Sequence, residues 1–183
     1  NSNDITEYTY LKQAHETLGK AHGNVMLMKV QPTELYHAKI VDAESKKKSH
    51  VLVANFSTAI TCVAAHLPPR NKFAHLRKAH LQHIKNFIEQ ATPTDYFIMG
   101  DFNFQVDGED ISTLKACQLL DMWSFVHGNK NEGYTFNAQE NSLIKLIYAG
   151  FESRQLRLDR IVRGKNENSA WKPKTMKLFA NEA

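Results

Sequence analysis

The sequence has little cysteine and no long apolar run, and each of these absences narrows the class of protein. The only two cysteines, Cys62 and Cys117, lie inside apolar segments, which favours buried reduced thiols over a disulfide or a metal-binding pair. No apolar stretch approaches the length of a membrane-spanning helix. The first residues lack the basic-then-apolar pattern of a secretion signal. We therefore expect an intracellular protein, in the nucleus or the cytoplasm, that does not bind a membrane.

The composition is that of an ordinary soluble globular protein. Of the 183 residues, 42% are hydrophobic and 23% are charged, with a formal net charge of +4 and a pI near 9.0. A mildly basic chain suits a polyanionic partner such as nucleic acid or a phosphorylated lipid head group, although many basic proteins bind neither. No internal repeat or low-complexity linker divides the chain. We expect one domain over residues 1–164 and an irregular tail over residues 165–183.

The spacing of apolar residues predicts alternating strands and helices. A strand that ends at His66, a long amphipathic helix and a second strand follow one another, which favours neighbouring strands in an α/β sheet. The predicted helices cover residues 3–18, 72–90 and 110–120. The predicted strands cover residues 25–30, 34–41, 50–56, 60–66, 95–99 and 156–162, and the lysine run 46–48 is predicted to form a solvated hairpin tip.

Polar residues stand at the ends of three predicted strands. His66 ends one strand, Asp101 and Asn103 follow another, and the pair Asp159–Arg160 interrupts the last apolar strand. In α/β sheets such groups commonly build the site, and alternation along an extended chain would let Asp101 and Asn103 face one cleft. Each also has a structural interpretation: a capping histidine, an Asx turn and an ion pair.

These motifs resemble those of the endonuclease/exonuclease/phosphatase superfamily, in the same order. Residues 98–103 are similar to its Gly-Asp-x-Asn motif, residues 62–67 to its strand that closes on a catalytic histidine, and residues 158–161 to its Asp-Arg-Ile strand. The segments 120–125, 133–137 and 156–161 narrow the resemblance to the 5′-tyrosyl-DNA phosphodiesterase branch.

The resemblance implies an incomplete α/β sandwich of two sheets, of the DNase I-like type. It also implies a Mg²⁺- or Mn²⁺-dependent phosphodiesterase that hydrolyses 5′-phosphotyrosyl–DNA bonds in DNA repair, with tyrosyl-bearing DNA 5′ ends as its substrate. In that enzyme His66 would bind a phosphate oxygen, and Asp101 would activate water and contact the metal ion. Asn103 would hold the phosphate and Asp159 would support the site, with Phe136 and Arg160 binding substrate. For Phe136, a place in the core is an equally good interpretation.

Two parts of the superfamily pattern are missing. The main metal ligand, a glutamate on an early strand, has no counterpart, and the final Ser-Asp-His motif is absent because the last histidine is His127. Gln105 stands where many relatives have arginine. We therefore expect a fragment that lacks both ends of the catalytic domain. A non-catalytic nucleic-acid-binding remnant, and an enzyme that acts on RNA ends or phosphoinositides, are the alternatives; the oligomeric state is left open.

Overall fold

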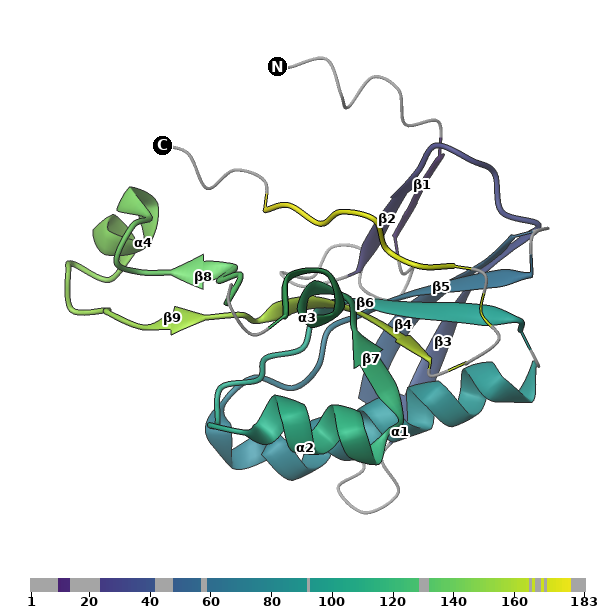
Figure 1. Cartoon of the computed structure of the whole chain (residues 1–183), viewed down its shortest axis with the longest axis horizontal. Helices are drawn as coiled ribbons and strands as arrows, with labels where there is room; N and C mark the ends of the chain where they lie inside the picture. Colours follow the sequence, from purple (N-terminus) through teal and green to yellow (C-terminus); the bar gives the residue numbers. More distant parts are fainter. Residues whose placement is uncertain are drawn as a thin grey trace.

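A six-stranded mixed sheet forms the centre of the molecule (Figure 1). The computed structural model describes residues 10–13, 24–41, 48–56, 59–91, 93–128, 132–164, 166, 169 and 171–178. The strand order is β3 (Glu34–Val41), β4 (Lys48–Phe56), β5 (Ile60–Ala65), β6 (Asp95–Asp101), β10 (Asp159–Gly164) and β7 (Leu119–Asp121). All neighbours in this order are antiparallel except β5 and β6, which are parallel. The α/β class predicted from the sequence is confirmed.

The parallel pair β5 and β6 is joined by one long helix. After a short 3₁₀ turn, η3 (Asn71–Phe73), helix α1 (Ala74–Gln90) runs back along the sheet. Leu81, Ile84 and Ile88 are buried on its inner side at helical spacing. The predicted order of strand, crossover helix and adjacent strand is confirmed.

The main core lies between the sheet and two helices on the same side of it (Figure 1). Side chains alternate along each strand, so every second residue faces α1 and α2 (Glu109–Ala116). Val63 of β5, Ile98 of β6 and Val162 of β10 meet there and are fully buried. The remaining strand residues therefore face the other side of the sheet.

A two-stranded sheet covers part of that other side. Its strands are β1 (Tyr10–Gln13) and β2 (Val25–Met28), and Met26 and Met28 pack against residues of β4. The prediction of a helix over residues 3–18 is wrong at 10–13, because these residues pair with β2 as a strand. The rest of that prediction, and residues 46 and 47 of the lysine run, lie outside the described residues.

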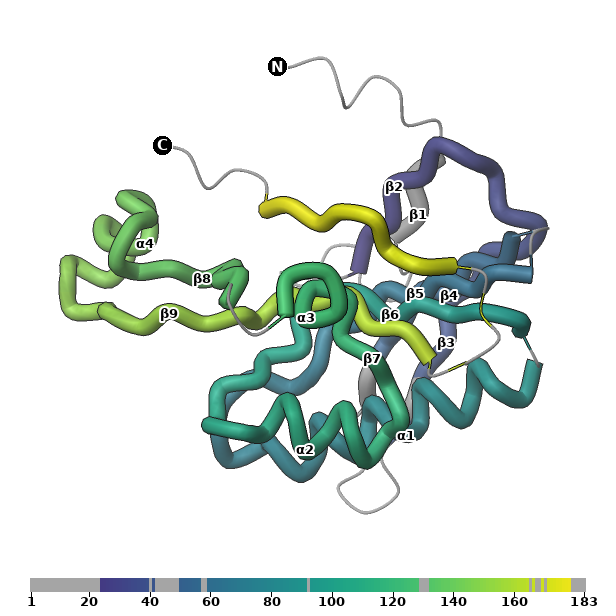
Figure 2. Tube along the Cα trace, viewed as in Figure 1, coloured from purple at the N-terminus to yellow at the C-terminus, as the bar shows by residue number. Residues whose placement is uncertain are grey.

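A hairpin arm projects from the body of the molecule, as Figure 2 shows. It consists of β8 (Phe136–Asn137), helix α4 (Ser142–Ile147) and β9 (Gln155–Leu156). Asn141 starts α4 because its side-chain oxygen accepts hydrogen bonds from the amides of Leu143 and Ile144. The final strand predicted over 156–162 is in fact two, β9 in the arm and β10 in the sheet.

The helix predicted over residues 110–120 ends early and gives way to a strand. Helix α2 stops at Ala116, Gln118 takes a positive φ of 54°, and β7 then leads into α3 (Met122–His127). Further along, residues 171–178 contain no helix or strand. They are held where His127 contacts the carbonyl oxygen of Met176 at 3.0 Å and Arg163 binds that of Trp171. Within the described chain, no helix combines the length and the apolar character required to traverse a bilayer.

Candidate functional site

Three neighbouring strands bring His66, Asp101 and Asp159 to one face of the sheet. In the pairing of β6 with β10, Asp101 lies opposite Asp159. The parallel pairing of β5 with β6 runs to Ala64 and Met99, and two residues further along both strands His66 lies beside Asp101. The amide of Leu67 donates to the carbonyl oxygen of Asp101 at 2.9 Å, and this bond holds the two chain segments together just after β5 and at the end of β6. Because side chains alternate along a strand, all three point away from the face that α1 and α2 cover. The structure thus brings these predicted residues together.

His66 and Asp101 form the centre of the group. His66 Nε2 lies 3.6 Å from Asp101 Oδ2, and their side chains are 41% and 34% exposed. Burial raises the pKa of Asp101, as does the nearby Asp159 carboxylate, while the Asn103 amide and His66 act in the opposite direction. The net effect is a raised pKa. Asp101 is therefore a stronger base than an ordinary carboxylate, and it remains accessible from solvent.

Asn103 borders the site from the loop after β6. Strand β6 ends at Asp101, so the alternation assumed in the sequence does not extend to Asn103, which has a φ of 53°. Its amide donates to Asp101 Oδ1 at 2.8 Å, which is an Asx turn. Its side chain is buried: Nδ2 donates to the carbonyl oxygen of Leu67 at 2.9 Å, and Oδ1 accepts from Gln105 Nε2 at 3.3 Å. Asn103 thus ties the loop after β6 to the loop after β5.

Gly100 allows the two site strands to approach closely. It has a φ of 130°, and a Cβ atom at this position would lie 2.1 Å from the carbonyl oxygen of Ala65. Only glycine combines that backbone conformation with that space. The glycine of the motif therefore has a packing role next to Asp101.

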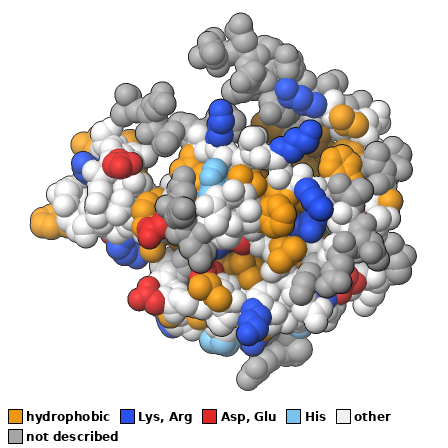
Figure 3. All heavy atoms as spheres, viewed as in Figure 1, with side chains coloured by type: hydrophobic (Ala, Val, Ile, Leu, Met, Phe, Trp, Pro, Cys, Tyr) orange, Lys and Arg blue, Asp and Glu red, His pale blue; other side chains and the backbone are white. Residues whose placement is uncertain are grey.

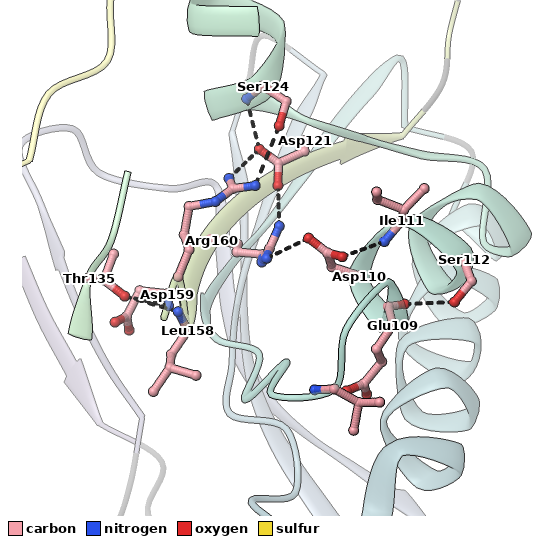
Figure 4. A network of polar contacts seen from close by, with 12 residues as sticks. Glu109, Asp110, Ile111, Ser112, Asp121, Ser124, Thr135, Leu158, Asp159 and Arg160 are labelled. Atoms are coloured by element: carbon pink, nitrogen blue, oxygen red, sulfur yellow. Dashed lines mark hydrogen bonds and ion pairs between the residues drawn. The ribbon is translucent and has the colours of Figure 1, made fainter. Parts of the chain in front are cut away.

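Arg160 is not brought into this group. It follows Asp159 in the same strand, so its side chain leaves the opposite face, and Figure 4 shows the two side chains on opposite sides of the strand. Its guanidinium donates to Asp121 Oδ2 at 2.7 Å and to Asp110 Oδ2 at 2.8 Å, and lies 5.1 Å from the centre of the Phe104 ring. Arg160 thus joins β10 to the starts of α2 and α3.

Sequence reasoning missed the rest of this network. Arg157 Nη1 donates to Asp121 Oδ1 at 2.7 Å, so two arginines share one carboxylate. Burial favours the neutral form of Asp121, but hydrogen bonds and charge from Arg157, the Ser124 amide and Arg160 outweigh it and lower the pKa. Asp121 immediately before an apolar helix is a recognisable N-cap signal, whereas its partners are distant in sequence.

The arm meets the site through Thr135. Its hydroxyl oxygen accepts hydrogen bonds from the amides of Leu158 at 3.1 Å and Asp159 at 3.0 Å. Phe136, the next residue, is half-buried and lies edge-on to Tyr148, with ring centres 6.3 Å apart. Phe136 is therefore part of the arm, one residue from the contact with Asp159.

A cavity of about 400 Å³ opens beside the loop that carries Asn103. Gln105, Tyr134 and Arg157 are among its lining residues, with Asp107 and Glu132 adding carboxylates. Its volume is in the range of small-ligand sites.

The described residues do not fit a complete site for Mg²⁺ or Mn²⁺. Among them, no group of three or more His, Cys, Asp or Glu side chains is placed to hold a metal ion. Asp101 Oδ1 already accepts from the Asn103 amide, and Oδ2 faces His66. A hard divalent cation needs more oxygen ligands than Asp101 can offer.

No family model and no curated protein matches the sequence. Solved structures do match. TDP2 from D. rerio, complexed with single strand DNA product, is 18% identical, with a TM-score of 0.69 over 97% of this chain and 70% of that chain. TDP2 from C. elegans is 16% identical, with a TM-score of 0.64 over 89% of this chain and 50% of that chain. An endonuclease/exonuclease/phosphatase family protein from Bacteroides thetaiotaomicron is 14% identical, with a TM-score of 0.59 over 87% of this chain and 61% of that chain.

The chain has their fold. The DNase I-like architecture predicted from the motifs is confirmed by these structures. At 14–18% identity the likeness concerns the fold, and the chain spans 50% of the length of C. elegans TDP2.

Proposed function

We propose that this chain belongs to a phosphodiesterase that cleaves nucleic acid, with the 5′-phosphotyrosyl–DNA bond of DNA repair as its substrate. One observation carries the proposal: a carboxylate of raised pKa, Asp101, lies 3.6 Å from an accessible imidazole, His66, on an open face of the sheet. A general base can activate the attacking water, and a hydrogen-bond donor beside it can stabilise the charge that develops on the phosphate.

The two groups have complementary roles. Asp101 accepts the proton of the attacking water, which forms the new phosphorus–oxygen bond. His66 Nε2 donates to a non-bridging phosphate oxygen, where negative charge increases in the transition state. The bond to the tyrosine oxygen breaks and the phenolate leaves. Because a phenol has a pKa of about 10, it leaves as an anion more readily than a sugar alkoxide. This favours the tyrosyl substrate.

Asp159 and Asn103 support this pair. Asp159 adds a second negative charge that contributes to the raised pKa of Asp101. Asn103 holds Asp101 Oδ1 through its amide and leaves Oδ2 directed toward His66. The superfamily resemblance implies a divalent cation, but the described residues do not supply its ligands, and the steps above use protein groups alone.

Two observations support nucleic acid as the substrate class. The chain carries a net charge of +4, which favours association with a polyanion. The D. rerio TDP2 structure of the same fold was solved with a single strand DNA product. Phe136, on the arm next to the Thr135–Asp159 contact, is our candidate for stacking on a base at the DNA end.

The test is hydrolysis of a single-stranded oligonucleotide with a 5′-tyrosyl group, under single-turnover conditions, with Mg²⁺ and with EDTA. We expect release of tyrosine, and we expect Asp101→Asn to slow it about 10²–10⁴-fold, since a general base contributes that much. Glu34→Gln, which alters an exposed carboxylate on β3 that binds Asn55, is the matched control and should leave the rate unchanged. Exclusive turnover of an inositol phosphate, or of RNA ends, would contradict the tyrosyl–DNA substrate.

A second candidate function is binding of nucleic acid without catalysis. It is favoured by the lack of a three-ligand metal cluster among the residues that the structure describes. Affinity for the oligonucleotide that falls steeply with salt, together with no tyrosine release in either buffer, would identify this function.

A further inference from the structure

Arg77 of α1 and Glu109 of α2 form a buried ion pair beneath the site. Arg77 is completely buried, and Glu109 is 7% exposed. Arg77 Nε donates to Glu109 Oε1 at 2.6 Å, and Nη2 donates to Oε2 at 2.7 Å. This is a two-pronged contact between planar groups, which is more directional than a single ion pair.

The same guanidinium also binds the loop after β5. Arg77 Nη1 donates to the carbonyl oxygens of Pro68 at 2.9 Å and Arg70 at 2.8 Å. On the other side, Glu109 Oε2 accepts from the amide of Val106 at 3.3 Å. One Arg–Glu pair therefore connects residues 66–70, the loop after β5, with residues 102–108, the loop after β6.

These two loops carry or border every residue of the proposed hydrolytic site except Asp159. His66 begins the first loop, and Asn103 lies in the second, two residues after Asp101. Two further bonds join the loops at the site itself, from the Leu67 amide to the Asp101 carbonyl oxygen and from Asn103 Nδ2 to the Leu67 carbonyl oxygen. The separation of His66 and Asp101 thus depends on how the loops are held together.

Backbone strain makes this dependence stronger. Arg70 and Asn103 have positive φ angles of 75° and 53°, and such conformations persist where the surroundings impose them. The carbonyl oxygen of Arg70 is one of the two that Arg77 binds. Without the hydrogen bond from Arg77, the loop loses one of the contacts that hold Arg70 in this conformation.

We infer that Arg77 and Glu109 are positioning residues that set the distance between His66 and Asp101. The inference rests on the proposed function for its catalytic consequence. A buried ion pair contributes little to stability compared with an apolar pair of similar size, so what Arg77 and Glu109 add here is the set of directed hydrogen bonds to the two loops. Lysine cannot replace Arg77, since an ammonium lacks the planar fork that reaches a carboxylate and two carbonyl groups at once.

The decisive variant is the double substitution Arg77→Met/Glu109→Leu, which removes both charges together. We expect it to stay folded, with faster amide hydrogen exchange in peptides covering 66–70 and 102–108 and unchanged exchange in β4. We expect kcat for tyrosine release to fall about 10²-fold, the effect of a displacement of about 1 Å, with KM unchanged. Arg77→Lys keeps the opposite charges but removes the planar guanidinium. We expect it to speed amide hydrogen exchange in the same two loops.

Lys85→Met is the matched control, because it removes an ion pair with Glu89 from the same helix without touching either loop. Unchanged exchange in both loops of the double variant and of Arg77→Lys would overturn the inference, and so would loosened loops with full kcat. If the unsubstituted protein releases no tyrosine, the proposed function fails, and the exchange measurement alone still decides whether the pair holds the loops.

Discussion

Asp121 is the residue on which two arginines converge. Its pKa lies below the ordinary value of 3.8 because Arg157, Arg160 and the Ser124 amide stabilise the charged form more than burial disfavours it. A carboxylate with a lowered folded-state pKa stabilises the protein at pH values above its unfolded pKa. That contribution is lost as pH falls through the folded-state value.

Asp121→Asn is therefore expected to destabilise the protein at pH 7 by about 3 kcal/mol, which is the typical cost of removing one partner of a buried ion pair. The difference from the unsubstituted protein should shrink below about pH 4 as Asp121 takes up a proton. Urea unfolding at a series of pH values measures it. A difference that stays constant down to pH 2 would show that the charge of Asp121 is not what stabilises the fold.

Gly100 lies where a side chain has no room. A Cβ atom there would lie 2.1 Å from the Ala65 carbonyl oxygen, in a backbone conformation with a φ of 130°. We expect Gly100→Ala to cost about 3 kcal/mol of unfolding free energy, from overpacking and strain together. The comparison is Gly108→Ala, at a glycine with a φ of 70° and nothing near its Cβ position, which should cost about 1 kcal/mol from the left-handed backbone alone. Equal costs for both would mean that the approach to Ala65 does not matter.

The sequence could place single residues only where alternation holds. It put His66 and Asp101 next to the ends of neighbouring strands, where β5 and β6 have them, but it put Asp159 inside a strand over 156–162, whereas Asp159 begins β10. Alternation also implies that Asp159 and Arg160 face opposite sides, as the structure shows. It could not place Asn103, because a positive φ at a non-glycine residue depends on contacts that are made only in the folded loop.

At the scale of elements, the sequence was informative where apolar periodicity was long. Helix α1 and the strands on either side of it were predicted within a few residues. Helix α4, with six residues, gave no periodic signal, and the end of α2 was missed because Gln118 takes a conformation typical of glycine. Strand β1 was mistaken for helix, since four residues pair with β2 through backbone groups that side-chain spacing does not report.

The arm provides a prediction about one element. Leu146, Ile147 and Phe151 are 77%, 65% and 93% exposed, and apolar side chains appear at the left end of the molecule in Figure 3. We expect the triple substitution of these residues by serine to reduce concentration-dependent self-association, with the unfolding free energy changed by less than about 0.5 kcal/mol.

Sedimentation velocity at several protein concentrations measures this association. The control is Ile111→Ser, an equally exposed apolar residue of α2 at 72% exposure, outside the arm. The idea fails if the triple variant associates as strongly as the unsubstituted chain, or if Ile111→Ser has the same effect.

In the molecule as a whole, the two faces of the sheet differ in what packs against them. The face under α1 and α2 holds the larger core and the buried Arg77–Glu109 and Arg160–Asp121 contacts. The other face carries the candidate site and is covered in part by β1 and β2. The division of the chain at residue 164 remains a prediction, although residues 171–178 contain neither helix nor strand.

The position of β10 in the sheet has a consequence for the order in which the molecule assembles. Among the described strands it is the last in sequence, yet it lies between β6 and β7, and β7 has no other described strand partner. During synthesis β5, α1 and β6 are made before β10, so one edge of β6 stays unpaired until residues 159–164 have been made. A chain interrupted before that point holds His66 and Asp101 without Asp159, and it lacks the arginine that joins the two smaller helices to the sheet. The pairing of β10 with β6 therefore joins the strands of the described sheet and brings Asp159 beside Asp101 in a single step.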